Sequence, residues 1–390
     1  MSHDKMNRFA RREFLRTGAI GALGAFTFRG TAWSYQAREL TLYVGTYTSG
    51  KSEGIYVCRM DRATGELKLF SSIQSVNPSF LAIDRSKRYL YAVNEVPEFG
   101  GKSGGAVSAF AIDSPTGNLR FLNQQASLGA DPCYLTVDRK RNSLLVANYT
   151  GGNVAVLPIK RDGRLGPATD LKQHEGSSIK EQQKGPHAHC IILDRAERHA
   201  LAADLGIDKV LIYRFDERTG KLSPGKQPWA PLRPGAGPRH LTLHPSSKYV
   251  YVINELDSTV TTFKYDGVNG TLSPLDTVST LPGDFSGSSY CADVHVSQSG
   301  KYLYGSNRGH DSIVVFAIDE RTGRLTQLEH VSTVGKWPRN FVIDPTGRFL
   351  LVANQHTDNV VTFRIDAQTG RLKPTGHVAE IPVPVCLKFA

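Results

Sequence analysis

The segment Gly237–Ser258, GPRHLTLHPSSKYVYVINELDS, carries an arginine near its start and a carboxylate near its end, Arg239 and Glu255. A guanidinium can hold an anion through paired hydrogen bonds and stabilise a developing oxyanion. A carboxylate can orient a histidine, pair with an arginine or act as a base. The residues between them have the pattern of two short β-strands joined by a Ser/Lys turn. Both groups therefore belong to the open end of one hairpin, and their chemistry depends on what else lies there.

This hairpin is one copy of a repeat that recurs about every 46 to 56 residues. A glycine-containing turn followed by leucine occurs seven times, with Gly where a hairpin needs a positive φ. A strand that begins near a proline also occurs seven times. The turns are Thr64–Leu67, Thr116–Leu119, Asp162–Leu165, Thr219–Leu222, Asn269–Leu272, Thr322–Leu325 and Thr369–Leu372; the strands begin at Pro78, Pro132, Ala188, Pro238, Cys291, Pro338 and Pro384.

Four strands per repeat without helical periodicity predict an all-β fold, a seven-bladed β-propeller with four antiparallel strands per blade. The first repeat, from Leu40, lacks its proline-led strand. The last proline-led strand begins at Pro384, and no other strand of a repeat comes after it. We expect the C-terminal strand to join the N-terminal blade, because this pairing closes the ring and removes an open sheet edge.

Two positions vary between repeats and should meet at one mouth of the central channel, because the strands that carry them are antiparallel. The second position of the proline-led strand holds Ser79, Cys133, His189, Arg239, Ala292, Arg339 and Val385. The position after a recurring Asn or Asp holds Thr46, Glu95, Tyr149, Leu205, Glu255, Arg308 and Gln355. His189, Arg239, Glu255 and Arg308 fall in successive blades and are the predicted catalytic set. A salt-bridged polar rim would give the same pattern.

His187, Arg339, Asn254 and Asn307 are the predicted substrate contacts, and His187 is an alternative to His189. The recurring asparagines, including Asn254 and Asn307, can also satisfy turn backbone groups. His244 is expected to lie in a turn. Four further histidines are expected at a rim or in turns, because no metal-ligand spacing links them. They are His240, His295, His310 and His356. No metal and no cofactor are predicted, and the five cysteines are expected to be small buried groups.

Residues 1–34 have the composition of an export signal of the twin-arginine type. Arg11 and Arg12 precede a weakly apolar stretch, and small residues follow at Ala32–Ser34. Removing residues 1–34 lowers the formal charge from +11 to +7. This remaining charge can attract an anionic substrate. The sequence has no basic cluster of the kind that is typical of nucleic-acid binding. No apolar run reaches about 18 residues, so no membrane anchor is expected in the mature form. The predicted location is periplasmic or secreted, and residues 35–390 form the single predicted domain.

The repeats resemble the seven-bladed propeller lactonase family, which includes propeller-type 6-phosphogluconolactonases and carboxy-cis,cis-muconate lactonizing enzymes. The similarity covers about residues 40–390 and rests on YVGTYT, NPSFLAID, YAVNE, GPHAHC, GPRHLTLHP, SNRG and PVCLKF. In the lactonizing branch a His, two Arg and a Glu form the proposed catalytic set. By motif they fall on His189, Arg239, Glu255 and Arg308.

The resemblance implies a metal-independent lactonase that hydrolyses a small anionic lactone or sugar lactone of the phosphogluconolactone type. His189 or Glu255 would activate water, while Arg239 and Arg308 hold the anionic group and the oxyanion. Export favours a sugar lactone outside the cytoplasm, because 6-phosphogluconolactone is a cytosolic metabolite. A muconate-type cycloisomerase and a non-catalytic exported binding propeller remain the alternatives.

Overall fold

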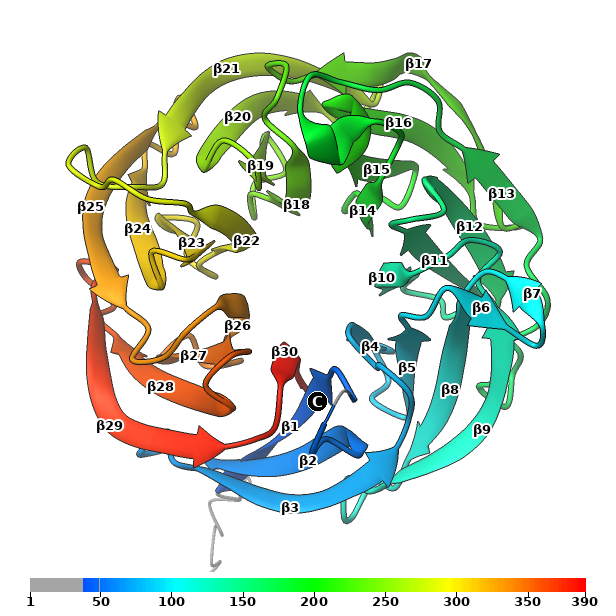
Figure 1. Ribbon diagram of the computed structural model, residues 1–390, viewed down its shortest axis with the longest axis horizontal. Coiled ribbons are helices and arrows are strands. Elements are labelled where there is room, and N and C mark those ends of the chain that lie inside the picture. The colour runs from blue at the N-terminus through cyan, green and yellow to red at the C-terminus, as the bar shows by residue number, and fades with distance from the viewer. Residues whose placement is uncertain (1–37, 49) are drawn as a thin grey trace, which may run out of the picture. The chain divides into compact units, whose positions relative to one another are not determined.

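Seven four-stranded antiparallel sheets are arranged in a ring around a central axis in the computed structural model (Figure 1). The structure describes residues 38–48 and 50–390, so the predicted signal at residues 1–34 lies outside this part. Residues Arg38–Ala390 form one compact unit. The predicted all-β, seven-bladed propeller is confirmed. Among the described residues, no helix has the length and apolar character that a membrane span requires.

The blades are numbered along the chain, each from its innermost strand outward. Blade 1 consists of β30 (Pro384–Phe389), β1 (Glu39–Thr46), β2 (Gly54–Asp61) and β3 (Leu67–Gln74). Blade 2 consists of β4 (Leu81–Ile83), β5 (Tyr89–Asn94), β8 (Ala106–Ile112) and β9 (Leu119–Ala126). Blade 3 consists of β10 (Pro132–Val137), β11 (Ser143–Asn148), β12 (Asn153–Pro158) and β13 (Asp170–Gln173). Blade 4 consists of β14 (Ala188–Leu193), β15 (His199–Asp204), β16 (Lys209–Asp216) and β17 (Lys221–Pro231).

The remaining blades follow the same order. Blade 5 consists of β18 (Pro238–Leu243), β19 (Tyr249–Asn254), β20 (Thr259–Asp266) and β21 (Thr271–Ser279). Blade 6 consists of β22 (Tyr290–Val296), β23 (Tyr302–Arg308), β24 (Ser312–Ile318) and β25 (Leu325–Ser332). Blade 7 consists of β26 (Pro338–Ile343), β27 (Phe349–Asn354), β28 (Asn359–Ile365) and β29 (Leu372–Glu380). A small hairpin and two short 3₁₀ helices lie in connections: β6 (Glu98–Phe99), β7 (Lys102–Ser103), η1 (Glu181–Gln183) and η2 (Leu205–Ile207).

The C-terminal strand closes the ring by pairing with the N-terminal strand. Val44 of β1 lies opposite Leu387 of β30, and Tyr43 lies opposite Lys388. Blade 1 is therefore assembled from both ends of the propeller sequence, as predicted. Through this pairing, the inner edge of β1 is covered by β30, so the backbone groups on that edge form hydrogen bonds within the sheet and not with water.

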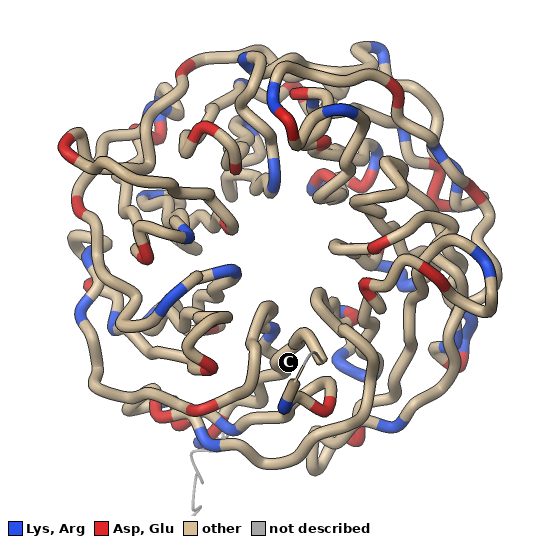
Figure 2. Tube along the Cα trace, in the orientation of Figure 1, with Lys and Arg blue, Asp and Glu red and all other residues tan. Residues whose placement is uncertain are grey.

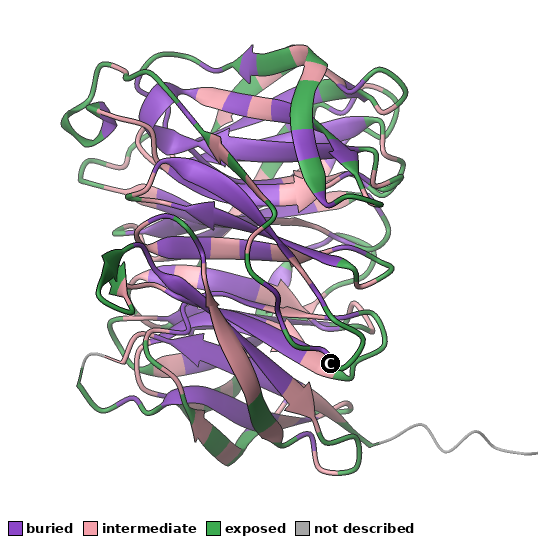
Figure 3. Cartoon of the chain, turned by 90° about the vertical axis from the view of Figure 1, so that its right-hand side faces the viewer, coloured by how far each residue is buried: buried purple, intermediate pink, exposed green. Residues whose placement is uncertain are grey.

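The burial of each strand follows from its place in the blade (Figure 3). β11 is buried at every position, because it lies between neighbouring blades and is covered on both faces. The outermost strand β29 alternates between exposed and partly covered positions after its first two residues. A strand covered on both faces needs a continuous apolar sequence, whereas a half-exposed strand tolerates alternation. The core is accordingly divided among the interfaces between blades; one such cluster joins Tyr251 and Ile253 of blade 5 to Leu303 and Val314 of blade 6.

Buried tyrosines link neighbouring blades to the repeated glycine turns. The seven turn glycines have φ between 63° and 86°, as the sequence pattern predicted. Tyr251 Oη donates a hydrogen bond to the carbonyl of Gly323 in the next blade, at 3.1 Å. Tyr43, Tyr91 and Tyr304 make the equivalent bond to Gly117, Gly163 and Gly370. The turn is thus fixed to the neighbouring blade as well as to its own strands.

Tyr251→Phe is expected to lower the free energy of unfolding by about 1 kcal/mol, because one buried hydrogen bond is lost and the Gly323 carbonyl is left without that donor. Urea unfolding followed by tryptophan fluorescence measures the effect, and an unchanged m value would show that the same unfolding reaction is compared. An unfolding midpoint equal to that of the wild type would contradict the expectation.

Candidate active site

A β-bulge sets the direction of the variable residue on the innermost strand. In β18, Pro238 pairs with Asn254 and His240 pairs with Ile253, so Arg239 has no partner across the ladder. The register shifts in the same way at His189 and at Arg339. A bulge bends the strand and releases one residue from the ladder, which redirects its side chain. Basic residues consequently mark the channel-facing strands β18 and β26 (Figure 2).

Glu255 joins two arginines from neighbouring blades. Its Oε2 atom lies 2.9 Å from Arg239 Nε and 2.8 Å from Arg308 Nη2. The side chains of Arg239 and Arg308 are 2% and 5% exposed, and a buried guanidinium needs such an anionic partner. Glu255, Arg239 and Arg308 form a charged trio. Within the described part of the chain, three of its atoms have neither a hydrogen bond nor an ion pair with the protein: Glu255 Oε1, Arg239 Nη2 and Arg308 Nη1. These atoms can contact a ligand.

Backbone carbonyls and an aromatic ring fix the Arg308 guanidinium. Its Nε donates to the carbonyl of Tyr290 at 3.2 Å, and Nη2 donates to the carbonyl of Cys291 at 2.9 Å. The Trp337 ring lies 5.3 Å from the guanidinium carbon, within the range of a cation–π contact. Trp337 has a φ of 65°, and its backbone N–H donates to Asp311 Oδ1 at 2.8 Å. Blades 6 and 7 together therefore hold Arg308 in one orientation.

His189 lies buried beside this trio. Its ring is nearly perpendicular to those of Tyr149 and His240, with centroid separations of 5.4 and 5.3 Å. Burial holds the pKa of His189 well below its usual value, and the charge of Arg239 lowers the pKa further. Nδ1 lies 3.7 Å from Cys133 Sγ, while Nε2 has no partner among the described side chains. His189 is therefore a neutral imidazole with one nitrogen available to a ligand or water.

The neighbouring arginines oppose the effect of burial on the pKa of Glu255 and add to that effect on Arg239. Burial alone would raise the pKa of Glu255, but Arg308, Arg239 and then Arg339 outweigh it, and the pKa lies below its usual value. Burial, aided by Arg308 and Arg339, lowers the pKa of Arg239 to about 10. At neutral pH Glu255 is thus ionised and a weak base, whereas Arg239 stays protonated. The two predicted bases differ in their contacts: Glu255 is paired with two arginines, whereas His189 Nε2 has no partner among the described side chains and can take a proton.

Arg339 belongs to a second polar group on the other side of the mouth. Its Nη2 donates to Tyr47 Oη at 2.6 Å, and Tyr47 Oη donates to Glu95 Oε1 at 2.8 Å. Ser79 donates to the second oxygen of Glu95. No carboxylate of the described residues lies within ion-pair distance of Arg339, and its Nε and Nη1 atoms have no partner there. Arg339 can therefore contact an anionic or hydroxyl group of a ligand.

The other predicted contacts differ in their placement. His187 is partly exposed, stacks on Tyr149 at 4.5 Å and lies within 3.0 Å of the Tyr149 carbonyl through Nδ1. Asn254 and Asn307 are fully buried. Their amide groups donate to Thr259 and Thr261, and to the Thr280 carbonyl and Ser312, respectively. The structure does not place these two as substrate contacts, because they hold the turns and have no surface that a substrate could touch.

Among the other histidines, His240 departs most from the expectation of a rim residue. His240 is buried and forms a hydrogen bond between Nδ1 and Asp293 Oδ1 at 2.8 Å. His295 also contacts Asp293, with Nε2 3.0 Å from Oδ2. His244 lies in its turn as expected, 2.7 Å from Ser246 Oγ. Sequence reasoning missed Tyr47 and Trp337, because both lie in connections between strands that have no repeated register.

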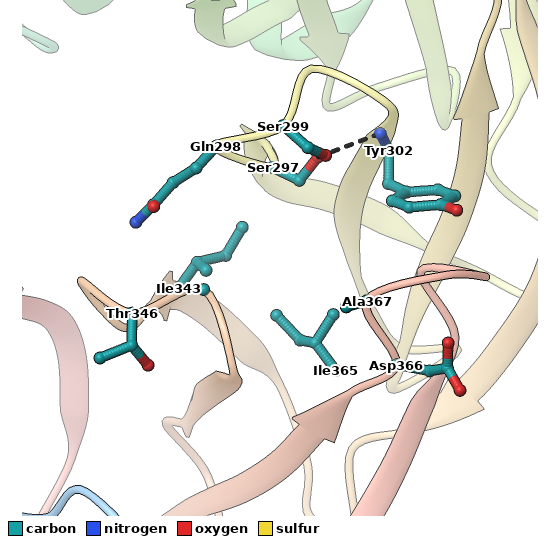
Figure 4. Close-up of a pocket in the computed structure, with 10 residues that line it drawn as sticks. Ser297, Gln298, Ser299, Tyr302, Ile343, Thr346, Ile365, Asp366 and Ala367 are labelled. Carbon is teal, nitrogen blue, oxygen red and sulfur yellow. Dashed lines mark hydrogen bonds between the residues drawn. The ribbon is translucent and has the colours of Figure 1, made fainter.

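Two further observations concern possible ligand sites. Over the described ranges, no group of three or more His, Cys, Asp and Glu side chains is arranged to hold a metal ion. A pocket of about 250 Å³ opens between blades 6 and 7 beside the turn from β22 to β23 (Figure 4). This turn follows the end of β22 that lies away from the mouth. The carboxylate of the pocket, Asp366, accepts hydrogen bonds at 2.9 Å from the backbone of its own turn. The pocket therefore lacks the titratable groups that the mouth brings together.

Comparison with known proteins agrees with this geometry. The family model "Lactonase, 7-bladed beta-propeller" matches residues 41–389. A 6-phosphogluconolactonase from Bacillus subtilis is 40% identical over 89% of this chain and 97% of its own, and one from Formosa agariphila is 35% identical over 78% and 86%. The periplasmic gluconolactonase PpgL of Pseudomonas aeruginosa superposes with a TM-score of 0.85 at 35% identity, over 90% of this chain and 99% of its own. The chain therefore belongs to the seven-bladed β-propeller lactonase family.

Proposed function

We propose that the protein is a lactonase, a carboxylic-ester hydrolase that opens a sugar lactone to its hydroxy acid at the channel mouth. The observation that carries the proposal is the buried His189, whose Nε2 has no partner among the described side chains, together with Arg239 and Arg308, which each keep one Nη atom without a protein partner there. Ester hydrolysis needs these two functions: a group that takes a proton from water, and donors for the oxyanion that forms.

In the proposed mechanism His189 Nε2 takes a proton from water as the water oxygen attacks the lactone carbonyl carbon. The carbonyl oxygen becomes an oxyanion and accepts hydrogen bonds from Arg239 Nη2 and Arg308 Nη1. When the intermediate collapses, the bond between the carbonyl carbon and the ring oxygen breaks, and the ring oxygen takes the proton from His189. Glu255 stays ionised and holds both arginines in place.

The polar lining of the mouth supports a hydroxylated or anionic lactone as the substrate. Arg239, Arg308 and Arg339 outnumber Glu255 and Glu95, so the mouth carries a net positive charge while His189 is neutral. Arg339, whose Nε and Nη1 have no partner among the described residues, and the partly exposed His187 are the proposed contacts for substrate hydroxyls or an acidic group. The relatives are named for 6-phosphogluconolactone and gluconolactone, which are substrates of this chemical class.

We further propose that the protein acts outside the cytoplasm after export by the twin-arginine route. Support comes from Arg11 and Arg12 before the apolar stretch of residues 17–28, and from a relative described as periplasmic. An exported enzyme would meet glucono-δ-lactone or a related sugar lactone rather than a phosphorylated intermediate of the cytosol.

Acid release by the wild-type protein tests the proposed function. A pH-stat would follow glucono-δ-lactone, 6-phosphogluconolactone and an unsubstituted δ-lactone, each corrected for spontaneous opening. We expect enzyme-dependent acid release with at least one sugar lactone, and much slower release from the unsubstituted lactone. Loss of muconate ultraviolet absorbance would instead indicate the cycloisomerase, and inactivity in both assays would favour a binding propeller.

Incubation with EDTA is expected to leave the rate of lactone opening unchanged, because the proposed mechanism uses His189 and two arginines in place of a metal-bound water. The measurement compares initial rates before and after chelation, and again after addition of Ca²⁺, Mg²⁺ or Zn²⁺. A loss with EDTA that one of these ions restores would contradict the metal-independent mechanism.

A further inference from the structure

A third polar group, formed by His240, Asp293 and Asn340, lies next to Arg239 on the innermost strands. The third position of the innermost strand is occupied by apolar or aromatic side chains in blades 1 to 4. In blades 5, 6 and 7 the same position holds polar side chains, all of them buried. The seven residues in blade order are Cys386, Phe80, Tyr134, Cys190, His240, Asp293 and Asn340. Three successive blades thus replace apolar packing with groups that must be paired, because an unpaired buried polar group is costly.

Asp293 is the centre of this group. Its Oδ1 lies 2.8 Å from His240 Nδ1, and its Oδ2 lies 3.0 Å from His295 Nε2. Asn340 donates to the same Oδ2 atom. Arg239 Nη1 lies 3.2 Å from the other ring nitrogen of His240 and donates to the carbonyl of Ala292. A continuous chain of contacts therefore runs from Glu255 through Arg239 and His240 to Asp293.

The donors and acceptors along this chain fix the protonation of His240. A guanidinium can only donate, so His240 Nε2 must accept from Arg239 through its lone pair. The proton of the neutral ring then resides on Nδ1 and is donated to Asp293 Oδ1. A carboxylate that holds a histidine in one tautomer is a known way to orient a group that acts in front of it.

We propose that His240, held by Asp293, is a positioning residue for Arg239, so that Arg239 Nη2 points at the reacting carbonyl oxygen. This inference rests on the proposed lactonase function. Glu255 Oε2 lies 2.9 Å from Nε as an ion pair without hydrogen-bond geometry, and the Ala292 carbonyl and His240 hold Nη1 by hydrogen bonds. Nη2 is then the one nitrogen of this guanidinium with neither kind of contact among the described residues. Without the acceptor at His240, the guanidinium can rotate away from this orientation, and a displacement of about 1 Å can cost about 100-fold in rate.

Two substitutions of His240 distinguish the contact that Nε2 makes with Arg239 from the contact that Nδ1 makes with Asp293. His240→Gln places an amide oxygen near the former Nε2 and retains the acceptor for Arg239, whereas His240→Asn places its amide near the former Nδ1 and retains only the contact with Asp293. We expect His240→Gln to keep kcat within about threefold of the wild type and His240→Asn to lower kcat about tenfold to 100-fold, with little change in KM. His199→Gln is the matched control, because His199 is also buried, faces Asp194 at 3.5 Å and lies where β15 begins, away from the mouth.

Nitrogen NMR of histidine-labelled protein tests the same inference without substrate. At neutral pH the His240 proton is expected on Nδ1, and Arg239→Ala is expected to shift the Nε2 resonance of His240. Equal kcat losses in His240→Gln and His240→Asn, a larger loss in His240→Gln, or a proton on Nε2 would overturn the inference. If the wild type opens no lactone, the proposed function fails, and the position of the proton and the response to Arg239→Ala still decide whether His240 contacts Arg239 as described.

Discussion

Glu255→Gln is expected to lower kcat/KM about 100-fold and the free energy of unfolding by about 3 kcal/mol. One carboxylate oxygen forms ion pairs with both Arg239 and Arg308, at 2.9 and 2.8 Å. The substituted amide retains the shape of the side chain but not its charge, so two buried guanidinium groups would repel each other without a counterion. The arginines should then move apart and no longer present their free N–H groups to one oxyanion. Initial rates of acid release and urea unfolding measure the two effects.

Glu217→Gln is the matched control for this substitution. Glu217 forms an exposed ion pair with Lys140 at 2.6 Å, away from the mouth, and such surface pairs contribute little. We expect kcat/KM to stay unchanged in Glu217→Gln and the stability to change by less than about 1 kcal/mol. Equal activity in Glu255→Gln and the wild type would show that the ionised trio is only a salt-bridged rim.

His189→Ala is expected to lower kcat about 100-fold to 10,000-fold, because general-base assistance by the imidazole is lost. The same argument predicts the pH dependence of the wild type. Burial and Arg239 hold the pKa of His189 well below 6.5, so the neutral, base-competent form persists as the pH falls through the range in which an ordinary histidine is protonated. The plot of kcat/KM against pH should therefore stay level through pH 6.5 and decline only in more acidic solution.

His187→Ala distinguishes the two neighbouring histidines. His187 stacks on Tyr149 and lies at the partly exposed edge of the mouth, so we expect its removal mainly to raise KM. A larger loss of kcat in His187→Ala than in His189→Ala would assign the base to His187. An acid decline of kcat/KM centred on the ordinary histidine pKa would also contradict the assignment of His189.

The repeats predicted the fold because their physical requirements are local. A glycine with positive φ is needed at each turn, and a strand covered on both faces needs an apolar run; neither depends on distant partners. The two variable positions likewise placed Arg239, Glu255 and Arg308 at one mouth, since antiparallel pairing fixes which strand ends are neighbours. Ring closure by β30 followed from the missing strand of the first repeat.

The contacts within the mouth depend on features that the repeat pattern does not specify. The bulge at Arg239 redirects the side chain, but sequence alone does not show where the register shifts. His240 has no metal-ligand spacing to another histidine, so the sequence predicts a rim or turn position, whereas its partner Asp293 lies 53 residues further along the chain. Comparing the third strand position across all blades would have revealed three polar residues in succession. Asn254 and Asn307 repeat around the ring, and their burial agrees with the structural role that such repetition indicates.

The most direct test of the central claim is the rate of sugar-lactone opening by the double variant Arg239→Ala/Glu255→Ala. Removing both residues leaves Arg308 as the one guanidinium of the trio, so no two guanidinium groups repel each other there, and a thermal melt would verify that the propeller remains folded. With the lactone that the wild type opens fastest, we expect a rate close to that of spontaneous opening. Equal rates for the folded double variant and the wild type would show that the reaction does not occur at this mouth.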